Sequence, residues 1–241
     1  MNDSEQVKRT DSRSQVRYRA VLYVNRYRNL FIPFAFISMA LFHFPLFLSR
    51  KISFYKLMGC GKNGTFDIHP DFNQWALMLF YKTDINNFFS TSEVTKRLPG
   101  AFINLWWRLF CTEIKSFHLE PVAGHGSWDG RVFINDSTTD KNHTGKLAVL
   151  TRATINLSRL RSFWSAVPVA ADSFEQNPGF IYSVGIGEIP FIKQATFSIW
   201  EDEEKMRSFA YQKSSHRDVI KRTKEEKWYS EEMFLRFRIL D

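Results

Sequence analysis

The second half of this chain repeats the order of features in its first half, and this repetition limits the folds that the chain can adopt. Residues 54–84 contain FYKLMGCG and, after a spacer, QWALMLFYKTD, while residues 180–202 contain FIYSVGIGE and, after a shorter spacer, QATFSIWED. A Gly-X-Gly turn and a strand that opens with glutamine therefore recur in the same order. A repeating unit of roughly a hundred residues is too long for a solenoid repeat and is typical of a duplicated α+β module.

The segments that precede the two Gly-X-Gly turns also agree. VLYVNRYRNLFIPFAFISM, which begins at Val21, aligns with VLTRATINLSRLRSFW, which begins at Val149, and most apolar positions coincide. Apolar periodicity predicts first-half strands at 20–27, 52–60, 74–83 and 112–122, with helices at 33–48 and 86–109, the latter broken at Pro99-Gly100. It predicts second-half strands at 147–155, 179–187, 194–201 and 231–239, with helices at 157–170, 203–212 and 216–227.

Each half then has the β-α-β-β-α-β order of the ferredoxin-like unit. We predict an α+β fold in which duplicated ferredoxin-like units pack as an α+β barrel within one chain, with an apolar chamber between the facing sheets. The expected division is a mobile basic arm at 1–18, a first half at 19–124, a connector at 125–145 and a second half at 146–241. Gly, Asp, Asn, Ser and Thr dominate the connector, which is typical of a loop or hairpin.

Composition leaves two uses for the aromatic residues. The 241 residues are 44% hydrophobic and 16% aromatic, including 24 Phe and 7 Trp. These rings either build a Phe-rich core or line a cavity for a large apolar molecule. Cys60 and Cys111 show no metal-binding spacing and fit a reducing compartment, so we expect a cytoplasmic location.

The net charge of +8 is concentrated near the N-terminus, where seven Lys/Arg and three acidic residues lie in the first thirty positions. RRM, KH and helix-turn-helix motifs are absent, so nucleic acid is not an expected partner. A basic arm suits peripheral contact with the anionic inner face of a membrane. FIPFAFISMALFHFPLFL at 31–48 is near the minimum length for crossing a bilayer, but it takes the place of the 157–170 helix. A buried or partly exposed helix is therefore favoured, and an exposed Phe-rich face would enter a membrane interface without spanning it.

Sequence motifs of common enzyme classes are missing. The chain has no serine-hydrolase, P-loop or dinucleotide-binding motif, and the paired glycines are interpreted as sites of strand bending or close backbone approach. No two of the six histidines have the i,i+4 spacing of a zinc helix. His43 is interpreted as an interior residue, His69 and His143 as solvent-exposed, and His118 and His125 as candidates to face the barrel interior.

His216 is the preferred functional histidine. Ser215-His216-Arg217-Asp218 resembles a capping box, which places His216 in the first turn of the 216–227 helix. The helix dipole disfavours a cationic imidazole there, so a neutral, ligand-competent ring is favoured. If the helix instead runs unbroken from 203, His216 shares a face with Phe209 and points inward. Either geometry suits the proximal ligand of a haem iron, and the alternative is a capping or core histidine without a metal.

The second half resembles a known family in an ordered set of segments. These are PGFIYSVGIGEIPFIKQATFSIWEDEEKMRSFAY from Pro178, then His216-Arg217, Ile220-Lys221-Arg222-Thr223, Trp228 and EEMFLRFRIL. Together with KLMGCGKNGTFDIHPDFNQWALM in the first half, they look like the spheroidene monooxygenase family of carotenoid biosynthesis, over about 20–119 and 147–240. The resemblance implies a haem-dependent, ferredoxin-supported oxygenase that hydroxylates a carotenoid carbon and, by a second hydroxylation, yields a ketone. It also implies a relation to the dimeric α+β barrel proteins.

The resemblance assigns roles to particular residues. It makes His216 the axial ligand of a haem (heme) iron, with dioxygen as co-substrate and reduced ferredoxin as electron donor. Arg217 and Arg222 become candidate partners of haem propionates, with ordinary surface charge as the alternative. Phe209 and Trp228 become candidate walls of the substrate pocket, with core packing as the alternative. The expected partners are a carotenoid or other apolar molecule, ferredoxin and a membrane surface, and the chain is expected to be a monomer or a homodimer.

Two alternative functions fit the same residues. One is a non-catalytic barrel that binds haem or a hydrophobic ligand for transport or sensing. The other is a cofactor-free monooxygenase of the same fold, which would oxidise an electron-rich aromatic molecule without a reductase.

Overall fold

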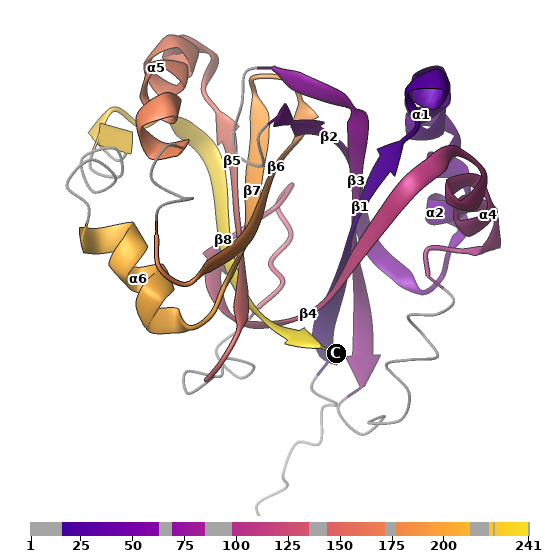
Figure 1. Ribbon diagram of the computed structural model, residues 1–241. Coiled ribbons are helices and arrows are strands. Elements are labelled where there is room, and N and C mark those ends of the chain that lie inside the picture. The colour runs from indigo at the N-terminus through magenta and orange to yellow at the C-terminus, as the bar shows by residue number, and fades with distance from the viewer. Residues whose placement is uncertain are drawn as a thin grey trace, which may run out of the picture.

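Eight antiparallel strands close into a single barrel with helices on its outside (Figure 1). The computed structural model describes residues 16–62, 69–84, 98–134, 144–171, 177–212, 222–223 and 225–240. The strands are β1 (Val16–Tyr27), β2 (Ile52–Gly61), β3 (Pro70–Asp84), β4 (Cys111–Gly126), β5 (Leu147–Ile155), β6 (Phe180–Ile189), β7 (Lys193–Trp200) and β8 (Tyr229–Leu240). The helices are α1 (Ile32–Leu41), α2 (His43–Leu48), α4 (Ala101–Phe110), α5 (Leu160–Ala171) and α6 (Glu203–Gln212), with 3-10 turns at Asn29–Phe31 and Leu157–Arg159.

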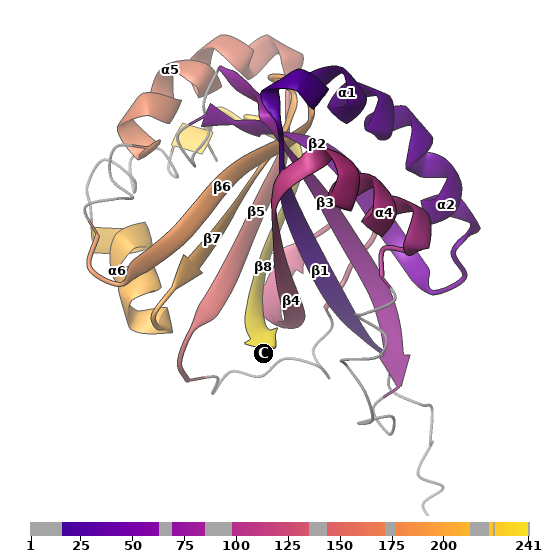
Figure 2. The ribbon, with the colours of Figure 1, turned by 45° about the vertical axis from the view of Figure 1, so that its right-hand side comes forward.

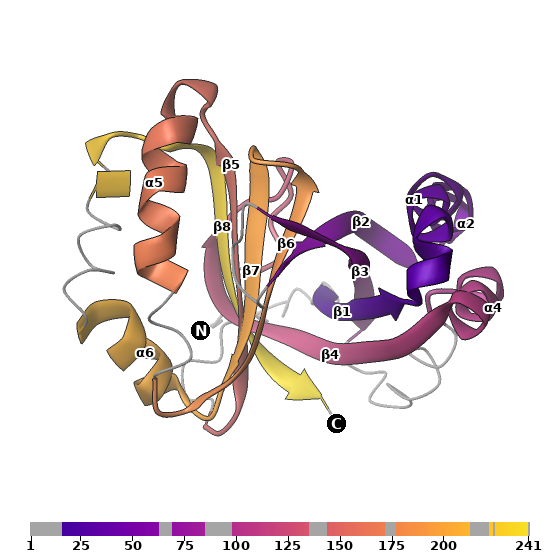
Figure 3. The same ribbon diagram turned by 45° about the horizontal axis from the view of Figure 1, so that its top comes forward.

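The two halves of the chain contribute equivalent sets of neighbouring strands. Around the barrel the order is β1-β3-β2-β6-β7-β5-β8-β4, so the first half reads β4-β1-β3-β2 and the second half β8-β5-β7-β6. Helices α1, α2 and α4 lie outside the first-half strands, and α5 and α6 lie outside the second-half strands (Figures 2 and 3). The mixed α/β architecture with an antiparallel sheet is confirmed, whereas descent from a duplicated unit stays a prediction.

The repeated glycines meet where the halves join. Gly59 of β2 pairs with Gly187 of β6, and Cys60 pairs with Ile186. A Cβ atom at Gly187 would lie 2.9 Å from the side chain of Gln194. Gln194 belongs to β7, so Gly187 allows a close approach within the second half, whereas a Cβ atom at Gly59 would meet only Trp75, at an ordinary 3.9 Å.

The inward-facing side chains fill the barrel. They alternate along each strand with residues that face the helices, as in β5, where Ala148 and Leu150 face inward while Leu147 and Val149 face outward. The interior cluster includes Leu22, Met58, Met78, Phe80, Leu119, Val184, Phe197, Leu235 and Phe237. All of these are buried, and together they make an apolar core.

Two residues from the described part of the connector complete this core. Trp128 and Phe133 are 0% and 3% exposed and belong to the interior cluster. Phe133 stacks on Phe80 with ring centroids 3.8 Å apart, and Trp128 lies edge-on to Phe54 at 5.6 Å. The predicted chamber between the sheet faces is therefore wrong for the part of the chain that the structure describes, because connector rings occupy that space.

Two other expectations change in the described residues. Strand β1 begins at Val16, so residues 16–18 of the predicted mobile arm belong to the barrel, and residues 1–15 lie outside the described part. His43, expected inside, is exposed and its Nδ1 lies 3.0 Å from the Tyr55 hydroxyl. His125 is also exposed and stacks on Phe234, whereas His69 is exposed as predicted. His143 lies outside the described residues.

Candidate functional site

The outer face of the second-half sheet carries a patch of small side chains between two apolar clusters. The patch consists of Thr151 and Ala153 on β5, Ser183 and Gly185 on β6, and Thr196 and Ser198 on β7. Thr196 is opposite both Thr151 and Gly185 in the strand register, so it occupies the centre. We call these six residues the small-residue patch. No bulky side chain rises from the patch, and all of its members except Thr151 are buried.

Aromatic residues flank the small-residue patch on both sides. Trp200 and Phe209, whose ring centroids are 5.0 Å apart, belong to a cluster with Leu147, Val149 and Met206 beside α6. Phe163 and Trp228, at 6.1 Å, belong to a second cluster with Ile155 and Ala166 beside α5. The predicted pocket residues Phe209 and Trp228 therefore both face this side of the sheet, but in separate clusters.

The predicted cofactor-binding residues are only partly described. His216 and Arg217 lie outside the described residues. Arg222 is exposed, its Nε donates to Glu226 at 3.2 Å, and its guanidinium lies 5.4 Å from the centre of the Trp228 ring. The hydrogen bond from Trp228 and the pairing with Arg222 lower the pKa of Glu226. Arg222 thus already has an anionic partner. To bind a propionate, it would have to release Glu226 or bind both carboxylates.

Thr196 carries a buried polar atom without a hydrogen-bond partner. The residue is 6% exposed, and its Oγ1 is buried and unpaired. The neighbouring Ser198 differs, because its hydroxyl accepts a hydrogen bond of 3.0 Å from the Trp200 indole. A buried hydroxyl without a partner costs free energy that a bound polar ligand would recover.

We expect Thr196→Val to raise the free energy of unfolding of the ligand-free protein by about 1 kcal/mol, because an unpaired buried hydroxyl is replaced by a methyl group of the same shape. Urea unfolding measures the change. Ser198→Ala is the matched control and should lower stability, since it leaves the Trp200 N–H without its acceptor. A loss of stability in Thr196→Val would show that the hydroxyl has a partner after all.

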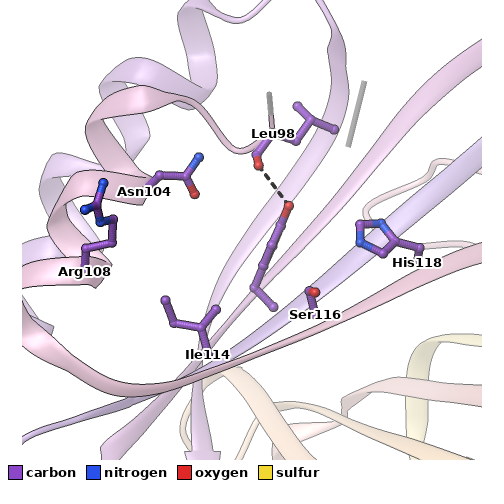
Figure 4. Close-up of a pocket in the computed structure, with 7 residues that line it drawn as sticks. Leu98, Asn104, Arg108, Ile114, Ser116 and His118 are labelled. Carbon is purple, nitrogen blue, oxygen red and sulfur yellow. Dashed lines mark hydrogen bonds between the residues drawn. The ribbon is translucent and has the colours of Figure 1, made fainter. Parts of the chain in front are cut away.

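The first half has a pocket of its own between α4 and the sheet (Figure 4). Its volume is about 400 Å³, and its lining residues are Tyr23, Leu98, Asn104, Arg108, Ile114, Ser116 and His118. The Tyr23 hydroxyl donates a 3.0 Å hydrogen bond to the Leu98 carbonyl. His118 thus faces the helix-covered side of the sheet, not the barrel interior. Its Nδ1 is buried without a hydrogen-bond partner, and burial lowers its pKa, which favours a neutral ring.

Charged residues meet at one end of the barrel interior. Arg152, only 1% exposed, forms ion pairs with Glu231, with Asp129 at 3.5 Å and with Glu188 at 3.6 Å. Lys56 pairs with Asp129 and with Glu188 at 2.5 Å, and Trp128 donates its indole N–H to Glu188 at 2.7 Å. We call this group the barrel-end ion cluster. It pairs charges of both signs, so it anchors the connector and closes the interior.

The barrel-end ion cluster predicts a loss of stability in acid. Burial raises the pKa of Glu231, but hydrogen bonds from the Gly130 amide, Ser127 and Arg152 outweigh it and leave the pKa lowered. A lowered folded-state pKa stabilises the protein above the unfolded value of about 4 and loses that contribution as the pH falls through the folded value. Urea midpoints should therefore decrease on acidification, and Glu231→Gln should flatten the dependence. An unchanged slope in that variant would contradict the assignment.

The described residues contain no group of three or more His, Cys, Asp and Glu side chains placed to hold a metal ion. Cys60 and Cys111 are buried and form no disulfide. Burial raises the pKa of both thiols, to about 12 for Cys111, so neither is a ready nucleophile.

Thr196 and the pocket at His118 were not predicted from the sequence. Alternation along β7 predicts that Thr196 faces away from the apolar side that carries Phe197. No local sequence pattern indicates that its hydroxyl lacks a hydrogen-bond partner.

Comparisons with known proteins identify the family. No family model matches the sequence. The spheroidene monooxygenase of Rhodobacter capsulatus is 32% identical over 212 residues, which cover 87% of this chain and 84% of that protein. The spheroidene monooxygenase of Cereibacter sphaeroides is 28% identical over 191 residues, which cover 79% of this chain and 56% of that protein. An aldoxime dehydratase structure, 12% identical, has a TM-score of 0.57 and covers 97% of this chain and 84% of its own, which shows a shared fold alone. The chain therefore belongs to the spheroidene monooxygenase family and is a monooxygenase.

Proposed function

We propose that this monooxygenase hydroxylates a carbon of a carotenoid or a similar long apolar molecule, and that a second hydroxylation of the same carbon yields a ketone after loss of water. The observation that carries this proposal is the 32% identity over 212 residues to a protein named spheroidene monooxygenase. Each hydroxylation inserts one oxygen atom of dioxygen into a C–H bond and reduces the other to water. The two electrons this requires come from reduced ferredoxin in our proposal.

The proposed site is the helix-covered face of the second-half sheet. The barrel interior is filled by its own side chains, so a long ligand needs another surface. The small-residue patch offers a flat floor, and Trp200 with Phe209 on one side and Phe163 with Trp228 on the other offer apolar walls. In the sequence, His216 comes four residues after the end of α6 and six residues before Arg222. Helix α6 and Arg222 both lie on this face of the sheet. His216 itself lies outside the described residues, so its assignment rests on the sequence and is part of our proposal.

We propose that the cofactor is a haem and that it binds on this face of the second-half sheet. The group is flat and apolar at its centre, which suits a floor of small side chains, and the unpaired Thr196 Oγ1 supplies a polar contact. We propose His216 as the iron ligand and Arg217 and Arg222 as partners of the propionates. When bound, the haem supplies the activation of dioxygen. We also propose that the two halves are duplicated ferredoxin-like units, which explains their common strand order.

The chain's own residues have three tasks in this proposal. The aromatic walls hold an extended polyene by burying its apolar surface. The same rings exclude water from the reacting carbon, which protects reactive intermediates from side reactions. His216 is proposed to hold the iron, with the uncharged ring that its capping-box sequence favours.

Reconstitution with a carotenoid in detergent, dioxygen, ferredoxin and a reductase tests the proposed function. The expected product is a pigment that has gained one oxygen atom, followed by the ketone. A non-catalytic binding protein would return the pigment unchanged. A cofactor-free monooxygenase would form product equally well when ferredoxin and reductase are omitted, and either result would reject the proposal.

A further inference from the structure

The first half exposes an unusually apolar helix surface. Leu30, Phe44 and Phe47 are 81%, 73% and 81% exposed, and Leu48, Leu105 and Leu109 are more than half exposed. The last two belong to α4, which packs beside α1 and α2, with the rings of Phe42 and Trp106 6.0 Å apart (Figures 2 and 3). We call these six residues the apolar surface. A helix face in contact with water ordinarily carries polar side chains, so this surface calls for an apolar partner.

The segment that carries most of the apolar surface has two different apolar faces. Ala35, Ser38, Phe42 and Leu46 are buried against the sheet at helical spacing. The outer face carries exposed apolar residues that recur at intervals of seven, four, three and four positions, namely Leu30, Ile37, Leu41, Phe44 and Leu48. Burial against the barrel therefore explains only the inner face. The outer face is exposed, and no described residue covers it.

Crossing the membrane does not explain the outer face. Asn29–Leu48 is long and apolar enough to span a bilayer by length and composition. However, the strands before and after it, β1 and β2, both pair with β3, so both ends of the segment return to one sheet. The segment is therefore a surface element of the barrel.

The surroundings of the apolar surface are basic. No acidic residue occurs between Asp11 and Asp67, a stretch that contains nine Lys and Arg residues. Among them, Arg28 precedes the apolar segment and Arg50 and Lys51 follow it, and all three are exposed. On α4, Arg108 is exposed next to Leu109. An apolar centre with a basic border complements a bilayer that has anionic headgroups and an apolar interior.

We propose that the apolar surface docks into the interface of an anionic lipid bilayer, with Phe44 and Phe47 among the acyl chains and Arg50 and Lys51 at the headgroups. A second copy of this chain is the less suitable partner. A two-fold symmetric contact would bring the same basic border against itself, and the segment between Asp11 and Asp67 has no carboxylate to pair with it.

Docking in this way sets the orientation of the enzyme. Asn104 and Arg108 of α4 line the pocket at His118, while Leu105 and Leu109 of the same helix belong to the apolar surface. The pocket therefore lies close to the bilayer surface. This proposal does not depend on the proposed function, because lipid binding can be measured without any substrate.

Flotation of the purified full chain with lipid vesicles tests the proposal. Binding is expected to vesicles of phosphatidylglycerol and phosphatidylcholine, and to weaken without phosphatidylglycerol or at high salt. Phe44→Ser with Phe47→Ser should reduce binding by about a hundredfold or more, because two exposed rings lose their apolar contact with the lipid. Leu157→Ser with Ile189→Ser, exposed positions of the second half, is the matched control and should bind as the unmodified chain.

A second pair of variants measures the electrostatic contribution to vesicle binding. Arg50→Gln with Lys51→Gln should weaken binding to anionic vesicles by about tenfold and reduce the effect of salt, whereas Arg159→Gln with Arg161→Gln should not. Absence of binding, or equal binding by the phenylalanine and control variants, would overturn the proposal. So would a stable dimer that Phe44→Ser with Phe47→Ser dissociates, which would make the surface an interface between copies. Carotenoid conversion in detergent would be unaffected by any of these results.

Discussion

Trp128→Ala is expected to lower the free energy of unfolding by about 3–5 kcal/mol, the usual cost of removing a fully buried large aromatic side chain. Trp128 is 0% exposed within the barrel, beside Phe54 and Phe80. Its loss would open a cavity that the rigid surrounding strands cannot close. It would also remove the 2.7 Å hydrogen bond to Glu188 and leave a carboxylate of the barrel-end ion cluster with one donor fewer.

Urea unfolding followed by far-ultraviolet circular dichroism measures this loss. Phe47→Ala is the matched control, because Phe47 is 81% exposed and its truncation should change stability by less than about 0.5 kcal/mol. Trp128→Phe should fall between the two, since it retains most of the ring volume but not the N–H. If Trp128→Ala were as stable as the unmodified chain, the connector would not fill the barrel, and an interior chamber would have to be considered again.

His216→Ala is expected to abolish haem binding and to lower product formation by about a hundredfold or more, because the proposed iron ligand is lost. The measurement is the absorption spectrum of protein purified from cells supplied with haem, combined with product analysis. The unmodified protein should show a Soret band and His216→Ala should not. Circular dichroism and the urea midpoint confirm that the variant is folded.

His118→Ala is the matched control for the ligand assignment. His118 is the other histidine that the sequence singles out and that lies next to a helix-covered pocket, and its Nδ1 has no hydrogen-bond partner. The account predicts that His118→Ala keeps the Soret band. The reverse pattern, with haem lost only in His118→Ala, would move the site to the first half. A haem-free protein that still converts carotenoid would reject haem dependence itself.

The secondary structure was largely predictable from sequence. Strand β5 begins and ends where the apolar pattern places it, at Leu147 and Ile155, and helix α6 spans the predicted 203–212. The apolar pattern predicts the strands well because one side of each strand faces the barrel core and the other faces the helices. Alternate residues are therefore apolar on both sides. The predicted helix 86–109 is described only from Ala101 to Phe110, and the 216–227 helix lies largely outside the described residues.

The filling of the barrel was not predictable in the same way. Periodicity tells which side of a strand is apolar, but not whether the facing sides meet or leave a chamber. Trp128 and Phe133 lie in a segment rich in turn residues, where composition indicates a loop. Their burial results from long-range contacts with Phe54 and Phe80, which a local pattern does not contain. The barrel-end ion cluster likewise joins residues far apart in sequence.

The candidate site was predictable only in part. Capping chemistry singled out His216, and family resemblance assigned it a role, but its assignment stays a prediction because the residue lies outside the described part. Phe209 and Trp228 were expected as walls of the substrate pocket or as core residues, and each packs in an apolar cluster on the helix-covered face, so their role in a pocket stays a prediction. Thr196 was missed, since an unpaired hydroxyl is a property of three-dimensional surroundings and not of spacing.

Oxidation of a carotenoid with isotopically labelled dioxygen tests the central claim most directly. The full chain is supplied with ferredoxin, a reductase and the pigment, and the hydroxylated product is examined by mass spectrometry before it reaches the ketone stage. The account predicts one labelled oxygen atom per hydroxyl group, with no product when the electron donor is omitted. Unchanged pigment, or a hydroxyl oxygen that derives from water, would contradict it.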